Sequence, residues 1–441
     1  MQVIVVYFQL SQMKSCRKEP HRGRNYRSWQ CLSYLIKFQQ LLCFEIKGYL
    51  CRWKCYLRAD MRYYVIAGEP SGDLHGSKLM RGIADCDSEA VFRCCGGDLM
   101  AKVSGKESLL YHYTDMSFFG FVQVVMNLRT IFRQIDHVER DIEEFRPDVI
   151  ILIDYPAFNL RIAKWAKSRG IKVYYYIAPK VWAWKERRVK KLRKYVDRLY
   201  TIFPFETDYF RGHGIEPTFC GNPLLDDISE RRATLPSREE FLRQNNLDKR
   251  PIVALLAGSR VSEIKANLPD MVAISKLFPE YQFVVTAVKW IDRSLYERYT
   301  SGSEVRYICD RTQQTLAHSV AAIVTSGTAT LETALMGIPE VVLYHIPWLY
   351  EKLKPYFLRI PYVSLVNINL KREAVKELVR AKLDMAEAER EIRAILPNGS
   401  RRESMLEEFD VLRNMFGGDG ASVRFARDMV DSLNNDNTNR G

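Results

Sequence analysis

The chain has 441 residues, of which 47% are hydrophobic and 27% charged, and its formal net charge is +13. This length exceeds the size at which a single hydrophobic core stops growing, so two domains are expected. The sequence has no uninterrupted apolar run long enough to cross a bilayer, which argues against a membrane-spanning helix.

Residues 1–60 differ in composition from the rest of the chain. They hold five of the ten cysteines and eleven Lys or Arg against three Asp or Glu, so they carry +8 of the net charge. A signal peptide needs an uninterrupted apolar core, whereas charged and amide side chains break the stretch 31–50. Cys51 and Cys55 could begin a zinc site, but no second pair follows at finger-like spacing. We expect residues 1–60 to be an over-extended start, with the working protein beginning at Met61.

From Met61 onward, strand patterns alternate with helical patterns in two series. The apolar run 149–153 is typical of a parallel strand that is covered on both faces. A polar stretch at 231–250, bracketed by prolines, predicts a domain boundary. Strands are expected at 63–67, 90–94, 149–154, 173–177 and 198–202, and then at 252–256, 282–286, 305–308, 321–325 and 341–344. Helices are expected at 74–84, 122–144, 261–277 and 328–336.

Two such series in one chain predict two doubly wound α/β domains with a ligand in the cleft between them. We expect a first domain at 61–230, a linker at 231–250 and a second domain at 251–433. The second domain would include a charged, helix-rich tail from Arg372, and residues 434–441 would be frayed.

Acidic side chains follow two of the first-domain strands. Glu69, Ser71 and Asp73 lie in the turn after the first strand, where turn and cap chemistry is the simpler interpretation. Asp154 ends the most apolar strand and is flanked by aromatic residues, so it is well placed to accept a proton from a hydroxyl. A helix N-cap is an equally good interpretation of Asp154 from spacing alone. If the two strands are neighbours, these acids share one crevice.

Two turns of small residues follow strands of the second domain, and each opens a helix. Small residues let the backbone approach a phosphate, and the amino end of a helix favours a negative charge. An arginine side chain can donate two hydrogen bonds to phosphate oxygens. Either turn alone could be tight packing, but together they favour a nucleotide site. The candidate residues are Gly258, Ser259 and Arg260 in the first turn, and Ser326, Gly327, Thr328 and the ribose-holding Glu332 in the second.

Other site classes find little support. The sequence contains neither a P-loop motif nor a dinucleotide-binding glycine motif after the first strand. No His, Cys or carboxylate cluster has metal-ligand spacing, so no metal is expected. The adjacent pair Asp226 and Asp227 is interpreted as solvated or capping.

Two further segments suggest an apolar or anionic partner. The first is either core or a patch for acyl chains or membrane, and it includes Phe118, Phe119, Phe121, Val122, Val125 and Met126. The second joins tryptophans to a basic helix, and it includes Trp182, Trp184, Lys185, Arg187 and Arg188. Aromatic and basic residues together suit an anionic bilayer surface, although a charge run is often only a solvated face. Nucleic acid is not expected, because no recognised nucleic-acid module surrounds the basic segment.

Eight short motifs carry a family resemblance. They are GEPSGD at 68–73, IDYPAFN at 153–159, PKVWAW at 179–184, FPFE at 203–206, GNP at 221–223, GSR at 258–260, SGTATLE at 326–332 and YVSLVN at 362–367. In this order they resemble the lipid-A-disaccharide synthases, which are membrane-associated glycosyltransferases.

The resemblance implies a GT-B-type α/β fold, with two Rossmann-like domains facing a central cleft. It also implies an inverting transfer without metal or cofactor, from UDP-2,3-diacylglucosamine to 2,3-diacylglucosamine 1-phosphate (lipid X), in lipid A biosynthesis. Asp154 resembles the general base, helped by Glu69, Ser71 and Asp73, and Asn367 would join the second-domain residues that hold UDP. The protein would act at the cytoplasmic face of the inner membrane, and a homodimer is compatible with this scheme.

Two alternatives stay open at this point. One is another UDP-sugar transferase or a UDP-N-acetylglucosamine 2-epimerase, since folds of this kind host several chemistries. An epimerase acting on a soluble sugar would have no use for an acyl patch. The other alternative is a non-catalytic membrane adaptor, in which two phosphate-type turns would serve no purpose.

Overall fold

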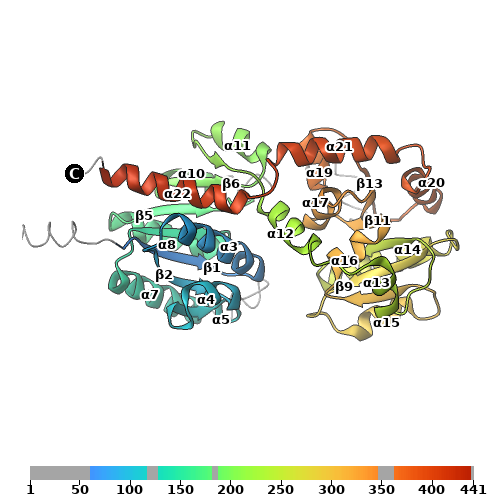
Figure 1. Cartoon of the computed structure of the whole chain (residues 1–441), viewed down its shortest axis with the longest axis horizontal. Coiled ribbons are helices and arrows are strands. Elements are labelled where there is room, and N and C mark those ends of the chain that lie inside the picture. Colours follow the sequence, from blue (N-terminus) through green and yellow to red (C-terminus); the bar gives the residue numbers. More distant parts are fainter. Residues whose placement is uncertain (1–59, 117–127, 181–186, 346–361, 439–441) are drawn as a thin grey trace, which may run out of the picture. The chain divides into compact units, whose positions relative to one another are not determined.

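The computed structural model describes residues 60–116, 128–180, 187–345 and 362–438. From Met61 onward these residues belong to one unit, which contains two parallel β-sheets with helices packed on them (Figure 1). The expected two-domain α/β architecture is therefore confirmed.

The first sheet has the strand order β3-β2-β1-β4-β5-β6-β7, and all of its described strand pairs are parallel. Its strands are β1 (Arg62–Ala67), β2 (Val91–Gly96), β3 (Leu109–His112), β4 (Val149–Ile153), β5 (Lys172–Tyr176), β6 (Arg198–Thr201) and β7 (Thr218–Phe219). The chain proceeds outward from β1 to β3 and then returns to β4 on the other side of β1. This reversal creates a topological switch point between β1 and β4.

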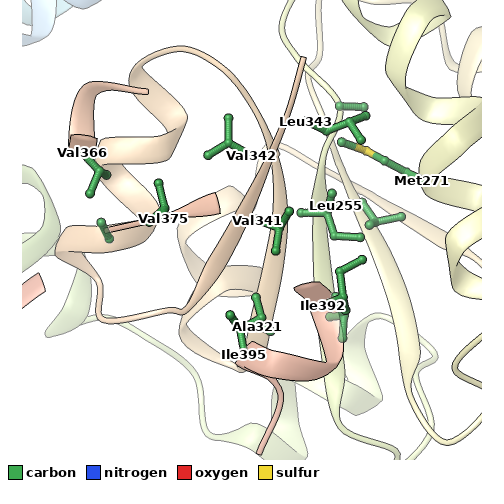
Figure 2. Packing of buried hydrophobic residues seen from close by; sticks show 14 of the residues in the cluster. Leu255, Met271, Ala321, Val341, Val342, Leu343, Val366, Val375, Ile392 and Ile395 are labelled. Atoms are coloured by element: carbon green, nitrogen blue, oxygen red, sulfur yellow. The ribbon is translucent and has the colours of Figure 1, made fainter. Parts of the chain in front are cut away.

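The second sheet repeats this winding with the order β10-β9-β8-β11-β12-β13. Its strands are β8 (Ile252–Leu256), β9 (Gln282–Ala287), β10 (Arg306–Cys309), β11 (Ser319–Thr325), β12 (Glu340–His345) and β13 (Lys376–Arg380). Figure 2 shows Leu255, Ala321 and Val341 from the central strands in one cluster with Met271 and Ile392 from the covering helices. Here the switch point lies between β8 and β11.

Helices connect the strands and cover the sheets. In the first half they are α3 (Pro70–Cys86), α4 (Asp98–Ser104), the 3₁₀ turn η1 (Lys106–Ser108), α5 (Tyr113–Met116), α7 (Leu128–Phe145), α8 (Pro156–Ser168), α10 (Arg187–Tyr195), α11 (Pro204–Arg211) and α12 (Pro223–Arg232). In the second half they are α13 (Arg238–Gln244), α14 (Val261–Ser275), α15 (Arg293–Thr300), α16 (Thr312–Ala317), α17 (Thr328–Leu335), α19 (Leu365–Leu370), α20 (Met385–Ile395), α21 (Arg402–Met415) and α22 (Ala421–Thr438).

The ten strands expected from the sequence are all present, with boundaries that shift by one or two residues. Three strands were missed: β3, β7 and β13. Each lies at an edge of its sheet, where one side of the strand has no neighbour and the sequence need not be apolar. β13 lies in the segment that we expected to be helix-rich. It was not predicted as a strand because its apolar centre is short and has the charged residues Lys376 and Arg380 at its two ends.

The last helix, α22, packs on the first sheet although it follows the second sheet in the sequence (Figure 1). Tyr174 on β5 donates a hydrogen bond to Ser432 Oγ at 3.0 Å, and Tyr200 on β6 donates to Asp428 Oδ1 at 2.9 Å. The expected second-domain range 251–433 therefore includes a helix that covers the first domain. α22 also continues through Asp436, which pairs with Lys172, where we expected a frayed end.

The pair Asp226 and Asp227 in α12 is buried, which corrects the interpretation of these residues as solvated. Asp226 does act as a cap, but for a distant helix: its carboxylate accepts from the backbone N–H groups of Gly420, Ala421 and Ser422 at the start of α22. Asp227 forms a buried ion pair with Lys78 of α3. Two adjacent carboxylates thus tie α12 to the first domain.

No helix within the described ranges is both long enough and apolar enough to cross a bilayer.

Candidate functional site

The first-domain switch point brings Glu69 and Asp154 to the same edge of the sheet. β1 and β4 are hydrogen-bonded neighbours, with Ala67 opposite Ile153 at their carboxyl ends. Glu69 follows β1 and Asp154 follows β4, and the Glu69 charge raises the pKa of Asp154. The two strands are neighbours, so the condition for these two acids to share one edge of the sheet is met.

The backbone at Asp154 has an unusual conformation. Asp154 and Tyr155 have φ values of 42° and 46°, in the left-handed region that non-glycine residues rarely occupy. Two buried donors hold the carbonyl of Asp154: Asn159 Nδ2 at 2.7 Å and the Tyr175 hydroxyl at 2.5 Å. Such strained positions persist only where the surroundings fix them, and they cluster at functional sites.

The N-cap interpretation of Asp154 does not describe this turn. α8 begins at Pro156 with Tyr155 as its N-cap residue, and no side chain caps the helix. The carboxyl group of Asp154 is therefore not used as a cap for α8.

Burial raises the pKa of Asp154 to about 6, and the nearby Glu69 charge adds to this shift. Lys180 and Arg188 act in the opposite direction and favour the carboxylate. A carboxyl group with this pKa is largely ionised at neutral pH yet basic enough to take a proton, which is what a general base requires.

The turn after β1 leaves no room for a side chain at Gly68. A Cβ atom placed there would lie 2.4 Å from the ring of Tyr155, whose hydroxyl donates to the Met116 carbonyl at 2.8 Å. The glycine thus lets the Tyr155 ring pack against the first turn and keeps the two acid-bearing turns in contact.

The side chain of Asp73 caps a helix within the fold. Its buried carboxylate accepts from the backbone N–H groups of Gly97, Leu99 and Met100 at 2.8–3.1 Å, at the start of α4. This arrangement is the cap chemistry that we weighed as the simpler interpretation. Ser71 is exposed in the first turn of α3, and no side chain caps that helix at Glu69.

In the second domain, the two candidate turns lie side by side, because β8 and β11 are paired. Gly258 has a φ of 111°, which glycine adopts without strain. The next two backbone N–H groups, those of Ser259 and Arg260, donate to Glu263 Oε2 at 2.9 and 3.2 Å. Glu263 Oε1 also accepts from Arg260 Nη1 at 2.8 Å. A side-chain carboxylate therefore occupies the donors that we expected to be available to a phosphate.

The second turn keeps its donors more open. α17 begins at Thr328 with Gly327 as its N-cap residue, and no side chain caps it. Gly327 and Thr328 are exposed, while Ser326 Oγ donates to the Val363 carbonyl at 2.8 Å. An exposed, uncapped helix amino end is a favourable place for an anionic group.

Glu332 lies in the second turn of α17. Burial raises its pKa, whereas the hydrogen bond from Gln313 Nε2, at 2.6 Å, and the Arg231 charge oppose the shift. The Gln313 side chain thus holds one oxygen of the Glu332 carboxyl group within the fold.

Asn367 is fully buried, and its side-chain amide is used within the fold. Its Nδ2 donates to Val375 O and Glu377 Oε1, and its Oδ1 accepts from the N–H groups of Ala374 and Val375, all at 2.8–3.0 Å. This geometry favours a role in shaping the loop before β13 over direct contact with a nucleotide.

Most of the expected acyl and membrane residues lie outside the described residues: Phe118, Phe119, Phe121, Val122, Val125, Met126, Trp182, Trp184 and Lys185. Of the basic segment, the structure describes α10, which begins at Arg187. Val189 and Leu192 are buried on one face of α10, and Lys190, Lys191 and Lys194 are exposed.

Two further residues lie at the second-domain edge and were not predicted from the sequence. The first is Glu263, for which the only sequence signal is an acid placed three residues after Arg260, as in a capping box. Trp290 follows β9, next to β8 in the sheet, and its indole N–H donates to the Ser259 carbonyl at 3.1 Å. Within the described ranges no group of three or more His, Cys, Asp or Glu side chains could hold a metal ion.

Solved structures share this two-sheet arrangement. The UDP-GlcNAc 2-epimerase from Neisseria meningitidis superposes with a TM-score of 0.59 over 84% of this chain and 100% of that chain, at 13% identity. The sucrose-phosphate synthase from Thermosynechococcus elongatus superposes with a TM-score of 0.53 over 85% of this chain and 99% of that chain, at 12% identity. The likeness extends to the fold alone, and it defines the class: a two-domain protein of the GT-B glycosyltransferase and epimerase fold.

Sequence relatives identify the family within this class. The model of the lipid-A-disaccharide synthetase family matches residues 63–415. The lipid-A-disaccharide synthase of Syntrophus aciditrophicus is 36% identical over 82% of this chain and 95% of its own length. That of Myxococcus xanthus is 34% identical over 84% of this chain and 97% of its own length. The chain belongs to the lipid-A-disaccharide synthetase family, and it is a glycosyltransferase of lipid A biosynthesis.

Proposed function

We propose that the protein transfers 2,3-diacylglucosamine from its UDP derivative to the 6-hydroxyl of 2,3-diacylglucosamine 1-phosphate, with inversion at the anomeric carbon. The products would be the lipid A disaccharide 1-phosphate and UDP. The family membership supports the substrate class, and the geometry around Asp154 supports the chemistry.

In the proposed reaction, Asp154 accepts the proton of the acceptor hydroxyl as its oxygen attacks the anomeric carbon of the donor. The bond from this carbon to the diphosphate breaks, and the electron pair leaves with UDP. The amino end of α17 and the Arg260 guanidinium would stabilise the charge that develops on the diphosphate. Ser71 and Glu69 would orient the acceptor, and Glu332 would hold the ribose hydroxyls.

The observation that carries this proposal is the carboxyl group of Asp154. It follows the central strand β4, it is fixed by a strained turn, and its pKa of about 6 suits a base at neutral pH. Arg188, which lowers this pKa, is partly buried near the start of α10, whose exposed basic face includes Lys190, Lys191 and Lys194. We propose that this face contacts anionic lipid at the inner membrane, so that Asp154 works close to the bilayer surface.

A UDP-N-acetylglucosamine 2-epimerase is the alternative with the same fold. The epimerase from Neisseria meningitidis shares the fold but only 13% of its sequence with this chain, whereas the two synthases named above share 34–36%. The synthase function therefore has more support.

The function is tested by UDP release in detergent with EDTA present. Release from UDP-2,3-diacylglucosamine should require the acylated glucosamine 1-phosphate acceptor, and the product should be the disaccharide. Acceptor-independent conversion of UDP-N-acetylglucosamine would favour an epimerase instead. Loss of activity in EDTA that Mg²⁺ restores would contradict a metal-independent transfer.

The pH dependence of kcat/KM should show the titration of Asp154. A general base works only when it is ionised, so kcat/KM should fall about tenfold per pH unit below about pH 6 and level off above it. In Glu69→Gln the like charge is gone, the pKa of Asp154 falls, and the acidic limb should move to lower pH. Glu89→Gln, at an exposed position, should leave the limb in place. An unchanged limb in Glu69→Gln would contradict the proposed coupling.

Glu263→Gln should tighten UDP binding. The Glu263 carboxylate holds the Ser259 and Arg260 donors, so it competes with the diphosphate for them. Neutralising it should lower the Kd for UDP by roughly 2- to 10-fold, the range that corresponds to the net free energy of one ordinary hydrogen bond. Calorimetric titration at low and high salt measures the effect, which should shrink as salt screens the charge. Weaker binding would mean that Glu263 preorganises the turn instead.

A further inference from the structure

Trp290 is the most exposed large hydrophobic side chain among the described residues, with 64% of its surface accessible. Tryptophan combines a large flat apolar surface with one N–H donor, and it is enriched where proteins bind other molecules. Its position is fixed by the hydrogen bond from its indole N–H to the Ser259 carbonyl. The ring is therefore anchored at one edge and uncovered over most of its surface.

Trp290 lies beside the second-domain switch point, at the end of the strand that flanks β8 on the side away from β11. β9 lies next to β8, so the turn after β9 adjoins the Gly258–Arg260 turn after β8. The N–H of Lys289 donates to Asp310 Oδ1 at 3.1 Å, which ties the Trp290 turn to the end of β10. Lys289 and Arg260 are both exposed, so the Trp290 turn and the neighbouring Gly258–Arg260 turn each carry an exposed cationic side chain.

We propose that Trp290 is the stacking platform for the uracil base of the nucleotide. This inference rests on the proposed UDP-sugar donor and adds the residue that would recognise its base. Diphosphate oxygens need cations and backbone donors, which the Lys289 side chain and the exposed, uncapped amino end of α17 offer. A pyrimidine ring instead needs a flat apolar surface with an open face. The exposed face of the indole next to Ser259 meets that requirement, and bases stack readily on tryptophan.

The test compares ligands with and without a base, using the full-length protein. Trp290→Ala should raise the Kd for UDP by roughly 5- to 100-fold, in keeping with the stacking strength of one base, and leave the Kd for inorganic pyrophosphate unchanged. Trp290→Phe keeps a ring but loses the N–H, and it should retain most of the affinity for UDP. The KM for the UDP-sugar donor should rise by the same factor with kcat unchanged, because stacking is equal in the ground and transition states.

Phe132→Ala is the matched control, because it removes another exposed aromatic ring, on α7, and should leave UDP binding unchanged. An unchanged Kd for UDP in Trp290→Ala would overturn the platform. Equal weakening of UDP and pyrophosphate would also overturn it, since Trp290 would then only support the Ser259 turn. Reduced binding to phosphatidylglycerol vesicles with unchanged UDP affinity would make Trp290 a membrane contact instead. If the unmodified protein bound no UDP, the proposed function would fail together with this inference.

Discussion

Asp154→Asn should reduce kcat by roughly 10²- to 10⁴-fold, the range that general-base catalysis contributes. Asparagine has nearly the same shape, so the turn held by Asn159 and Tyr175 should persist, because both donors bind the backbone carbonyl and not the side chain. The amide cannot accept the proton of the acceptor hydroxyl at any pH. The acidic limb near pH 6 should therefore disappear from the residual activity.

The measurement combines turnover with UDP binding in the same preparation. UDP affinity should stay within about twofold of the unmodified protein, because the proposed nucleotide contacts lie after β8, β9 and β11. Asp136→Asn makes the same chemical change on the exposed face of α7 and should leave turnover unaltered. Retained turnover in Asp154→Asn would exclude Asp154 as the base, and a joint loss of turnover and UDP binding would indicate a folding defect.

The position of Asp154 could be predicted from the sequence because its strand is entirely apolar. The run 149–153 is typical of a buried parallel strand, and the residue that ends such a strand lies at the ligand edge of the sheet. The turns at Gly258 and Ser326 were predictable for the same reason. The pairing of β1 with β4 stood only as a condition at the sequence level, and the pairing of β8 with β11 was not predicted; the structure shows both.

The uses of individual polar side chains could not be predicted in the same way. Asp73 and Asn367 belong to motifs that resemble the family, yet the structure uses both side chains to bind backbone groups. Asp73 accepts from residues at the start of α4, and Asn367 accepts from residues just before β13. Glu263 was missed because the sequence does not reveal that its carboxylate turns back onto the Ser259 and Arg260 donors. Spacing predicts which strand end a residue follows, but the partner of a carboxylate or amide depends on packing between elements.

Lys78→Met should lower the free energy of unfolding by about 3–5 kcal/mol, the cost of leaving one partner of a buried ion pair uncompensated. Lys78 on α3 is 7% exposed and Asp227 on α12 is 5% exposed, so the carboxylate could not recover its hydration without local opening. Glu230, whose Oε2 lies 2.9 Å from Lys78 Nζ, would lose the same cation. The double variant Lys78→Met, Asp227→Leu should regain much of the loss, because it removes both charges and keeps the volume apolar.

The damage should also extend beyond α12, because Asp226 in the same helix caps α22. Loosening α12 should therefore expose α22 and its contacts with the first sheet, which limited proteolysis and amide hydrogen exchange can detect. Urea unfolding gives the free energy, and Lys164→Met, at an exposed position on α8, is the matched control and should change it by less than about 0.5 kcal/mol. Equal stability of Lys78→Met and this control would show that the carboxylate of Asp227 is hydrated in solution. Protection of α22 despite a large loss of stability would show that the α22 cap does not depend on the Lys78 ion pair.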